Sequence, residues 1–331
     1  MLWNAELQRN GPGLLLRDIV GGRDPQVAAV VDVLVRLDAD IVVLTNLDHD
    51  PALQALSALE QRLRQAGRPY PHLYAPRPNS GQPTGFDIDG DGRKSGPEDA
   101  QSWGRFPGQG GTAVLSRLPL LRDRAQDFSA FLWADLPQAN LPPGMDPGLT
   151  AIQRLPSHSH VVLPVLLPGD RPLSLMIWHA SPPVFDGAED RNGRRNADEA
   201  AFWHHLLDGR IAAPPPAPPF VLLGTANLDP VDGDGDPVAL QALLHHPALA
   251  RLVPRGTHGR QEPGHLGDPA HDTALFAETG GLRVEYLLPS RDLRIIDSGV
   301  LWPPAPDPLT PRLEAASRHY PIWLDFSPAP P

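Results

Sequence analysis

The sequence contains no cysteine and no long apolar run. Without cysteine, neither a disulfide framework nor a thiolate metal site is available. No apolar stretch approaches the roughly 18 residues that cross a bilayer, and Met1 stands directly before the first predicted strand without a charged and apolar leader. We therefore expect a soluble chain, which is periplasmic or secreted to the outside if a leader has been removed.

Positive charge is also scarce, because 28 Lys and Arg face 39 Asp and Glu, for a formal net charge of −11. Non-specific binding to nucleic acid depends on Lys and Arg neutralising phosphates, so this charge argues against it. Proline and glycine, 42 and 30 of 331 residues, stay below the level of about 25–30% typical of disorder. We expect a single domain over residues 1–331, and a monomer.

The N-terminal part alternates short strands with amphipathic helices. Leu2–Leu7 alternates apolar and polar residues as a half-buried strand does, and Ile41–Leu44 is apolar like a buried strand. Asp24 and Pro25 provide an N-cap and a first-turn proline for one helix, and a second helix starts near Asp50. Further strands are predicted at Thr112–Ser116, Val161–Leu167, Leu173–Trp178 and Phe220–Leu223, and a helix at Asn192–Leu207.

Residues 76–111 form a Gly-, Pro- and Asp-rich insertion that is too long for a simple connector. In it, Asp87, Asp89 and Asp91 alternate along the chain and Glu98 follows at position twelve, which is the pattern of a calcium-binding loop. The flanks are not helical, so we predict an isolated Ca²⁺ site, with a solvated acidic loop as the alternative. A looser acidic cluster follows Asn227 and consists of Asp229, Asp232, Asp234 and Asp236. It would either bind a second Ca²⁺ or place negative charge at the entrance of the site and exclude polyanions.

Three short motifs follow one another in the second half of the chain. They are Gly224-Thr225-Ala226-Asn227, Arg283-Val284-Glu285-Tyr286-Leu287 and Ser317-Arg318-His319-Tyr320-Pro321. With an asparagine on the first strand and a histidine at the end of an apolar strand, they resemble the endonuclease/exonuclease/phosphatase family, whose motifs read Gly-Asp-x-Asn, Arg-(Ile/Val)-Asp-Tyr and Ser-Asp-His-x-Pro. Two carboxylates of the family are replaced here by Thr225 and Arg318, and a family glutamate falls on Asn46.

The resemblance spans Asn4 to Phe326 and implies an α/β fold: a four-layer α-β-β-α sandwich of two mostly antiparallel sheets with outer helices. It also implies a metal-dependent hydrolase of phosphate esters, of phosphodiesterase, nuclease or phosphatase type, with Mg²⁺ or Mn²⁺ at a partly degraded site. The alternative is a non-catalytic member that binds a phosphorylated ligand. The implied catalytic residues are His179, Asn227, Glu285 and His319, and the implied phosphate-binding residues are Asn4 and Arg318.

Glu285 and His319 form the best-preserved part of the resemblance. A carboxylate beside an imidazole holds it in one tautomer and stabilises its charged form, so we predict that the two side chains are hydrogen-bonded. His179 could instead be structural. The helix start that follows it could present guanidinium groups to a phosphate or be simply solvated: Arg191, Arg194 and Arg195.

Glu6 and Asp48 are the carboxylates that could replace the lost metal ligands. Because strand side chains repeat with period two, Glu6 is expected on the face of Asn4, and Asp48 on the face of Asn46. The alternative is that both are solvent-facing residues at strand ends.

Overall fold

A computed structural model describes residues 1–327 as two β-sheets packed face to face. The first sheet contains, in order, β12 (Ile295–Val300), β13 (Ile322–Phe326), β1 (Leu2–Leu7), β2 (Ile41–Leu47), β4 (Gly111–Ser116) and β3 (His72–Tyr74). The second contains β11 (Glu285–Pro289), β8 (Phe220–Thr225), β7 (Arg171–His179), β6 (His160–Leu167) and β5 (Gln126–Asp127). Only β1–β2 and β7–β8 pair in parallel, so both sheets are mostly antiparallel as predicted.

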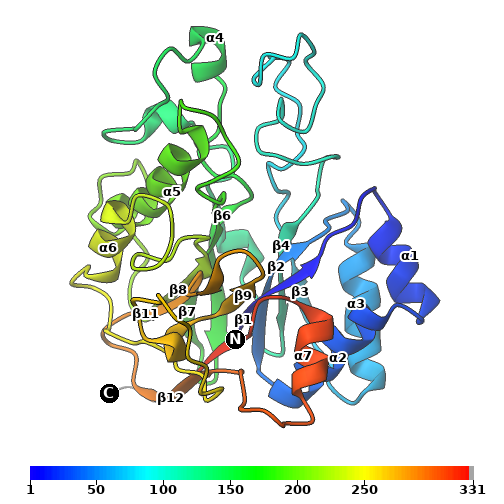
Figure 1. Cartoon of the computed structure of the whole chain (residues 1–331). Coiled ribbons are helices and arrows are strands. Elements are labelled where there is room, and N and C mark those ends of the chain that lie inside the picture. Colours follow the sequence, from blue (N-terminus) through cyan, green and yellow to red (C-terminus); the bar gives the residue numbers. More distant parts are fainter. Residues whose placement is uncertain (328–331) are drawn as a thin grey trace.

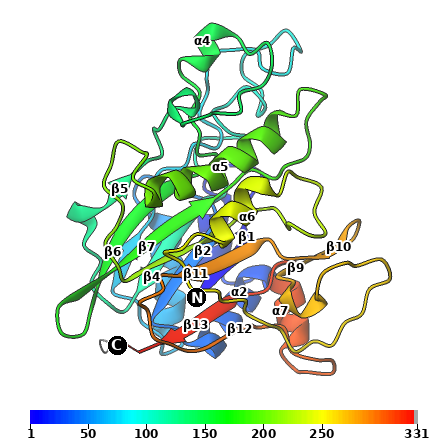
Figure 2. The same ribbon diagram turned by 90° about the vertical axis from the view of Figure 1, so that its left-hand side faces the viewer.

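Helices cover the outer face of each sheet, which completes the predicted four layers (Figure 1). The first sheet carries α1 (Leu14–Gly21), α2 (Pro25–Leu37), α3 (Gln54–Gln65) and α7 (Thr310–Ala316). The second carries α5 (Arg191–Leu207) and α6 (Val238–Leu244), which lie across its strands in Figure 2. The remaining elements are short: the hairpin β9 (Ala274–Phe276) and β10 (Gly280–Leu282), α4 (Pro147–Thr150), and single turns at Arg122–Arg124, Trp133–Asp135 and Pro269–His271.

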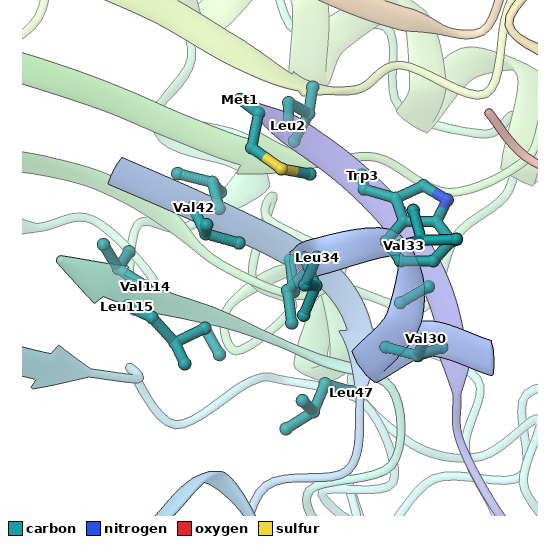
Figure 3. Packing of buried hydrophobic residues seen from close by; sticks show 14 of the residues in the cluster. Met1, Leu2, Trp3, Val30, Val33, Leu34, Val42, Leu47, Val114 and Leu115 are labelled. Atoms are coloured by element: carbon teal, nitrogen blue, oxygen red, sulfur yellow. The ribbon is translucent and has the colours of Figure 1, made fainter. Parts of the chain in front are cut away.

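Two apolar cores hold the layers together. The larger fills the space between the sheets and beneath the helices of the first sheet, where Trp3, Leu34 and Val42 are fully buried (Figure 3). The smaller lies between the second sheet and its helices and is built around Trp178 and Trp203. Burial of apolar surface is worth about 25 cal/mol per Å², so these cores provide most of the favourable free energy of folding.

Local signals located most of the longer elements correctly. Asp24 accepts the amide of Val27 at 2.8 Å, which is the predicted N-cap of α2. α3 begins later than predicted, because the carboxylate of Asp50 accepts the amides of Ala52, Gln54 and Ala55 and so holds a turn before the helix. The sequence analysis did not predict the following elements: α1, α4, α6, α7, β3, β5, β9, β10, β12 and β13.

The insertion is held by side chains that bond to backbone groups. Asn79 donates from its side chain to the carbonyl of Pro156 at 2.7 Å, and Gln153 donates to the carbonyl of Gln101 at 2.7 Å. The insertion and the part of the chain around α4 rise together at the top of the molecule in Figures 1 and 2. The long insertion is therefore part of the packed structure at this end of the molecule.

Candidate functional site

Strand ends from both sheets meet at one end of the sandwich. In the second sheet, Thr225 at the end of β8 is in register with His179 at the end of β7 and with Glu285 at the start of β11. Thr45 near the end of β2 faces them from the first sheet, since its hydroxyl oxygen lies 2.7 Å from that of Thr225. We call this end of the sandwich, with the residues described below, the site end.

Glu285 is the centre of a buried hydrogen-bond chain. Its Oε1 accepts the Nδ1–H of His319 at 2.7 Å, which is the predicted contact, and the hydroxyl of Thr225 at 3.4 Å. Its Oε2 is buried and has no hydrogen-bond partner within residues 1–327. Burial would lower the pKa of His319, but the charge and the hydrogen bond of Glu285 outweigh that effect and raise it above the usual histidine value.

The threonine pair in this chain was not anticipated from the sequence. Thr45 and Thr225 are both fully buried, and the second of these hydroxyls donates onward to Glu285. Thr225, which replaces a family carboxylate, therefore has an uncharged hydrogen-bond partner, Thr45, on the facing sheet. Thr45 gave no signal of its own, because only the packing of the two sheets brings it to Thr225, 180 residues further along the chain.

His179 lies in an environment opposite to that of His319. It is 3% exposed and its ring stacks on that of His158, with centroids 3.9 Å apart and planes at 9°. Burial, and then the charges of His158 and His319, hold the pKa of His179 well below the usual value. Burial therefore favours the neutral form of His179, whereas Glu285 favours the charged form of His319.

Glu6 and Arg318 form a second pair at the site end. Glu6 Oε1 accepts Nε of Arg318 at 2.9 Å and is also bonded by Nη2, while Oε2 accepts the backbone amide of Arg318 at 2.9 Å and the hydroxyl of Ser317 at 3.2 Å. Burial would raise the pKa of Glu6, but the bonds from Arg318 outweigh it and the pKa is lowered. Both oxygens of Glu6 are thus already engaged.

Asp48 is engaged by backbone amides and not by a side chain. Its two oxygens accept the amides of Gly110 at 3.0 Å and Arg9 at 2.8 Å, which ties the insertion to the end of β1. Burial nevertheless raises the pKa of Asp48 to about 6. In this structure Asp48 joins two segments of the chain, and it remains a metal ligand only as a prediction from sequence.

Three site positions adopt left-handed backbone conformations. Glu6, Asn46 and Asn227 have φ of 48°, 62° and 53°, and the β1–β2 pairing shifts register between Asn4 and Leu7. Such bulges re-aim side chains and are common beside active sites. The alternation of side chains between the two faces of a strand, from which the faces of Glu6 and Asp48 were predicted, is therefore interrupted at these positions.

The asparagines of the site end and the arginines of α5 are all hydrogen-bonded to other protein groups. Asn4 accepts the amide of Glu6 at 3.3 Å through its side chain, and Asn227 donates to the carbonyl of Ala180 at 2.8 Å. Arg195 is buried and bonds to the backbone carbonyls of four residues, so it supports the fold: Gln101, Arg154, Leu155 and Pro156. Arg191 and Arg194 likewise bond to protein groups.

Within residues 1–327, the only three acidic or imidazole groups close enough to share one ion lie in the insertion. They are Asp87, Asp89 and Asp99, and Asp99 is 1% exposed. Asp91 and Glu98, which the sequence pattern also selected, are not in this group. Glu98 accepts the indole N–H of Trp103 at 3.3 Å, and Asp91 accepts the amide of Arg93 at 2.7 Å.

The family model described as "Endonuclease/Exonuclease/phosphatase family" matches residues 1–319. The chain belongs to this family. Its members are metal-dependent phosphoesterases and nuclease-type hydrolases, and they typically use divalent metals such as Mg²⁺. A comparison with curated proteins finds no match.

Solved structures of low sequence identity share the fold. An endonuclease/exonuclease/phosphatase from Beutenbergia cavernae is 19% identical with a TM-score of 0.56, and the match covers 98% of this chain and 70% of that one. A family protein from Leptotrichia buccalis is 12% identical with a TM-score of 0.51, over 98% of both chains. Sphingomyelinase C from Streptomyces griseocarneus is 14% identical with a TM-score of 0.50, over 97% and 96%. No helix in the described part of the chain is long and apolar enough to cross a membrane.

Proposed function

We propose that this protein hydrolyses phosphate esters at the site end, with His319, His179 and Asn227 as the groups that act on the phosphate. The observation that carries the proposal is the buried 2.7 Å hydrogen bond between Glu285 and His319. This contact favours the imidazolium form of His319, which can donate a proton from Nε2, and a positioned acid of this kind typically accelerates a reaction by about 10²–10⁴-fold. Family membership supports the same class of reaction.

Two histidines of the site end supply the two proton transfers of the proposed hydrolysis. A water oxygen attacks phosphorus and loses its proton to the neutral imidazole of His179, while the bond from phosphorus to the leaving oxygen breaks. His319 gives its proton to that oxygen. Asn227, whose amide is oriented by the carbonyl of Ala180, donates a hydrogen bond to a phosphoryl oxygen.

The Mg²⁺ or Mn²⁺ implied by the resemblance does not fit the carboxylates at the site end. Mg²⁺ prefers an octahedral shell of oxygen ligands, but Glu6 and Asp48 are already engaged by Arg318 and by backbone amides. Glu285 Oε2 is the one buried carboxylate oxygen there without a partner among the described residues. We therefore assign no step of the reaction to a metal ion.

Turnover of bis(p-nitrophenyl) phosphate and of p-nitrophenyl phosphate tests the proposal. We expect wild type to cleave at least one of them and His179→Ala to lose about 10²-fold or more of that activity, because the neutral base is gone. His246→Ala, which removes a buried histidine bonded to Asp208 at the C-terminal end of α5, is the control and should retain activity. Phosphate binding without turnover would favour the non-catalytic alternative. The neutral Thr45–Thr225 pair supports that alternative, because it occupies the position of a family carboxylate.

We also propose that the insertion binds Ca²⁺ through Asp87, Asp89 and Asp99. The three carboxylates lie close enough to share an ion, and without a cation they repel one another. Asp87 and Asp99 also accept backbone amides of the insertion, which orients them, and within residues 1–327 no arginine is bonded to them as Arg318 is to Glu6. An ion that binds only the native state stabilises it by about 2.7 kcal/mol at a hundred times its Kd. The melting temperature should therefore be higher in 1 mM Ca²⁺ than in EGTA.

Asp89→Asn should abolish this difference, whereas Asp123→Asn, at an exposed aspartate outside the insertion, should preserve it. Equal melting temperatures of wild type in EGTA and in millimolar Ca²⁺ would contradict the calcium proposal.

A further inference from the structure

Arg318 is held in one orientation beside His319. Two of its guanidinium nitrogens bond to Glu6, and its Cζ lies 5.3 Å from the ring centre of Phe276. The same ring packs edge-on against His319, at 5.5 Å between centroids. Its Nη1 has no hydrogen-bond partner among residues 1–327. The side chain is therefore positioned by two neighbours, Glu6 and Phe276, and keeps one donor edge free.

In the Glu6–Arg318 ion pair, the guanidinium is exposed to solvent and the carboxylate is largely buried. The side chain of Arg318 is 61% exposed, whereas that of Glu6 is 15% exposed. The carboxylate of Glu6 accepts four hydrogen bonds, all from the consecutive residues Ser317 and Arg318. Both of its oxygens are therefore occupied. A ligand that approaches this ion pair from solvent thus meets the guanidinium of Arg318 and not the carboxylate of Glu6.

A fixed guanidinium suits a phosphate better than a metal ion. It is planar, remains charged at every physiological pH and donates to phosphate oxygens in a fork. A divalent ion would need the oxygens of Glu6, and these are released only if the bonds to Arg318 break. The two cations therefore compete for the same carboxylate.

We propose that Arg318, oriented by Glu6, neutralises the phosphate of the ligand in place of a divalent ion, so that the site end binds phosphate without metal. The inference rests on the proposed function, since it assumes that the ligand is a phosphate ester. It assigns to Arg318 the charge neutralisation that a metal provides elsewhere. It predicts that chelators leave phosphate binding unchanged.

Calorimetric titration with inorganic phosphate tests this inference. Protein stripped of metal is titrated in EDTA, in EGTA with 5 mM Mg²⁺, and in EGTA with 5 mM Mn²⁺. Calcium is removed from the protein and from all three buffers beforehand, so Ca²⁺ bound in the insertion does not differ between the titrations. We expect the Kd to agree within about twofold in the three buffers and to rise about 10- to 100-fold in Arg318→Met, which loses charge-assisted hydrogen bonds.

Arg312→Met is the matched control, because Arg312 is 56% exposed and is paired with Asp32 on the outer helices. It should bind phosphate as wild type does, and Arg318→Lys should fall between wild type and Arg318→Met because it keeps the charge without the fork. Melting curves confirm that each variant is folded. Binding lost in EDTA and restored by Mg²⁺ would overturn the inference and leave the proposed function intact. No binding in any buffer would overturn both, and an unchanged Kd in Arg318→Met would remove Arg318 from the site.

Discussion

Glu285→Gln is expected to lower phosphodiester turnover by about 10²–10⁴-fold and to move the alkaline limb of the pH profile to lower pH. Glu285 raises the pKa of His319 through its charge and a 2.7 Å hydrogen bond. Glutamine keeps the size of the side chain but not the charge, so the imidazolium that donates the proton would be lost at a lower pH. The measurement is turnover as a function of pH for wild type and variant.

Glu60→Gln is the matched control, because Glu60 is also buried and hydrogen-bonded but lies on α3, away from the site end. It should leave the pH profile in place even if it lowers stability. A Glu285→Gln enzyme that loses turnover while its alkaline limb stays unchanged would mean that Glu285 only supports the fold. His319 would then not be the acid.

Thr225→Asp is expected to reduce stability strongly in chelator and to make the protein responsive to Mg²⁺. Thr225 is fully buried and 3.4 Å from Glu285, so the new carboxylate would face an existing one whose charge is already paired with His319. An uncompensated buried charge typically costs about 3–5 kcal/mol. Mg²⁺ that binds between the two carboxylates would restore part of this loss, and with Asn46→Glu it should raise diester turnover above wild type.

Thr225→Asn separates charge from shape, because it has the size of aspartate and no charge. Its melting temperature should not respond to Mg²⁺. Denaturant unfolding in EDTA and in 5 mM Mg²⁺ measures both effects. If Thr225→Asp and Thr225→Asn unfold alike in both buffers, the site end cannot be converted into a metal site by this one carboxylate.

The sequence by itself determined the family, the layer order and the pairing of Glu285 with His319. These rest on signals that are local along the chain: motifs of four or five residues at strand ends, the N-cap of Asp24, and the hairpin of β6 and β7. The contact between Glu285 and His319 was predicted from the resemblance to the family, which pairs these positions, and the structure contains it. The calcium pattern likewise located the acidic group, although Asp99 takes part in place of Asp91 and Glu98.

Only the tertiary structure decided the charge state of the site end. The bond of Glu6 to Arg318 joins residues 312 positions apart, and the Thr45–Thr225 bond joins the two sheets across 180 positions. Left-handed residues at Glu6 and Asn46 break the period-two rule by which the sequence assigned faces. Whether a carboxylate is free for a metal depends on which groups reach it, and that depends on packing between distant segments, which no local pattern encodes.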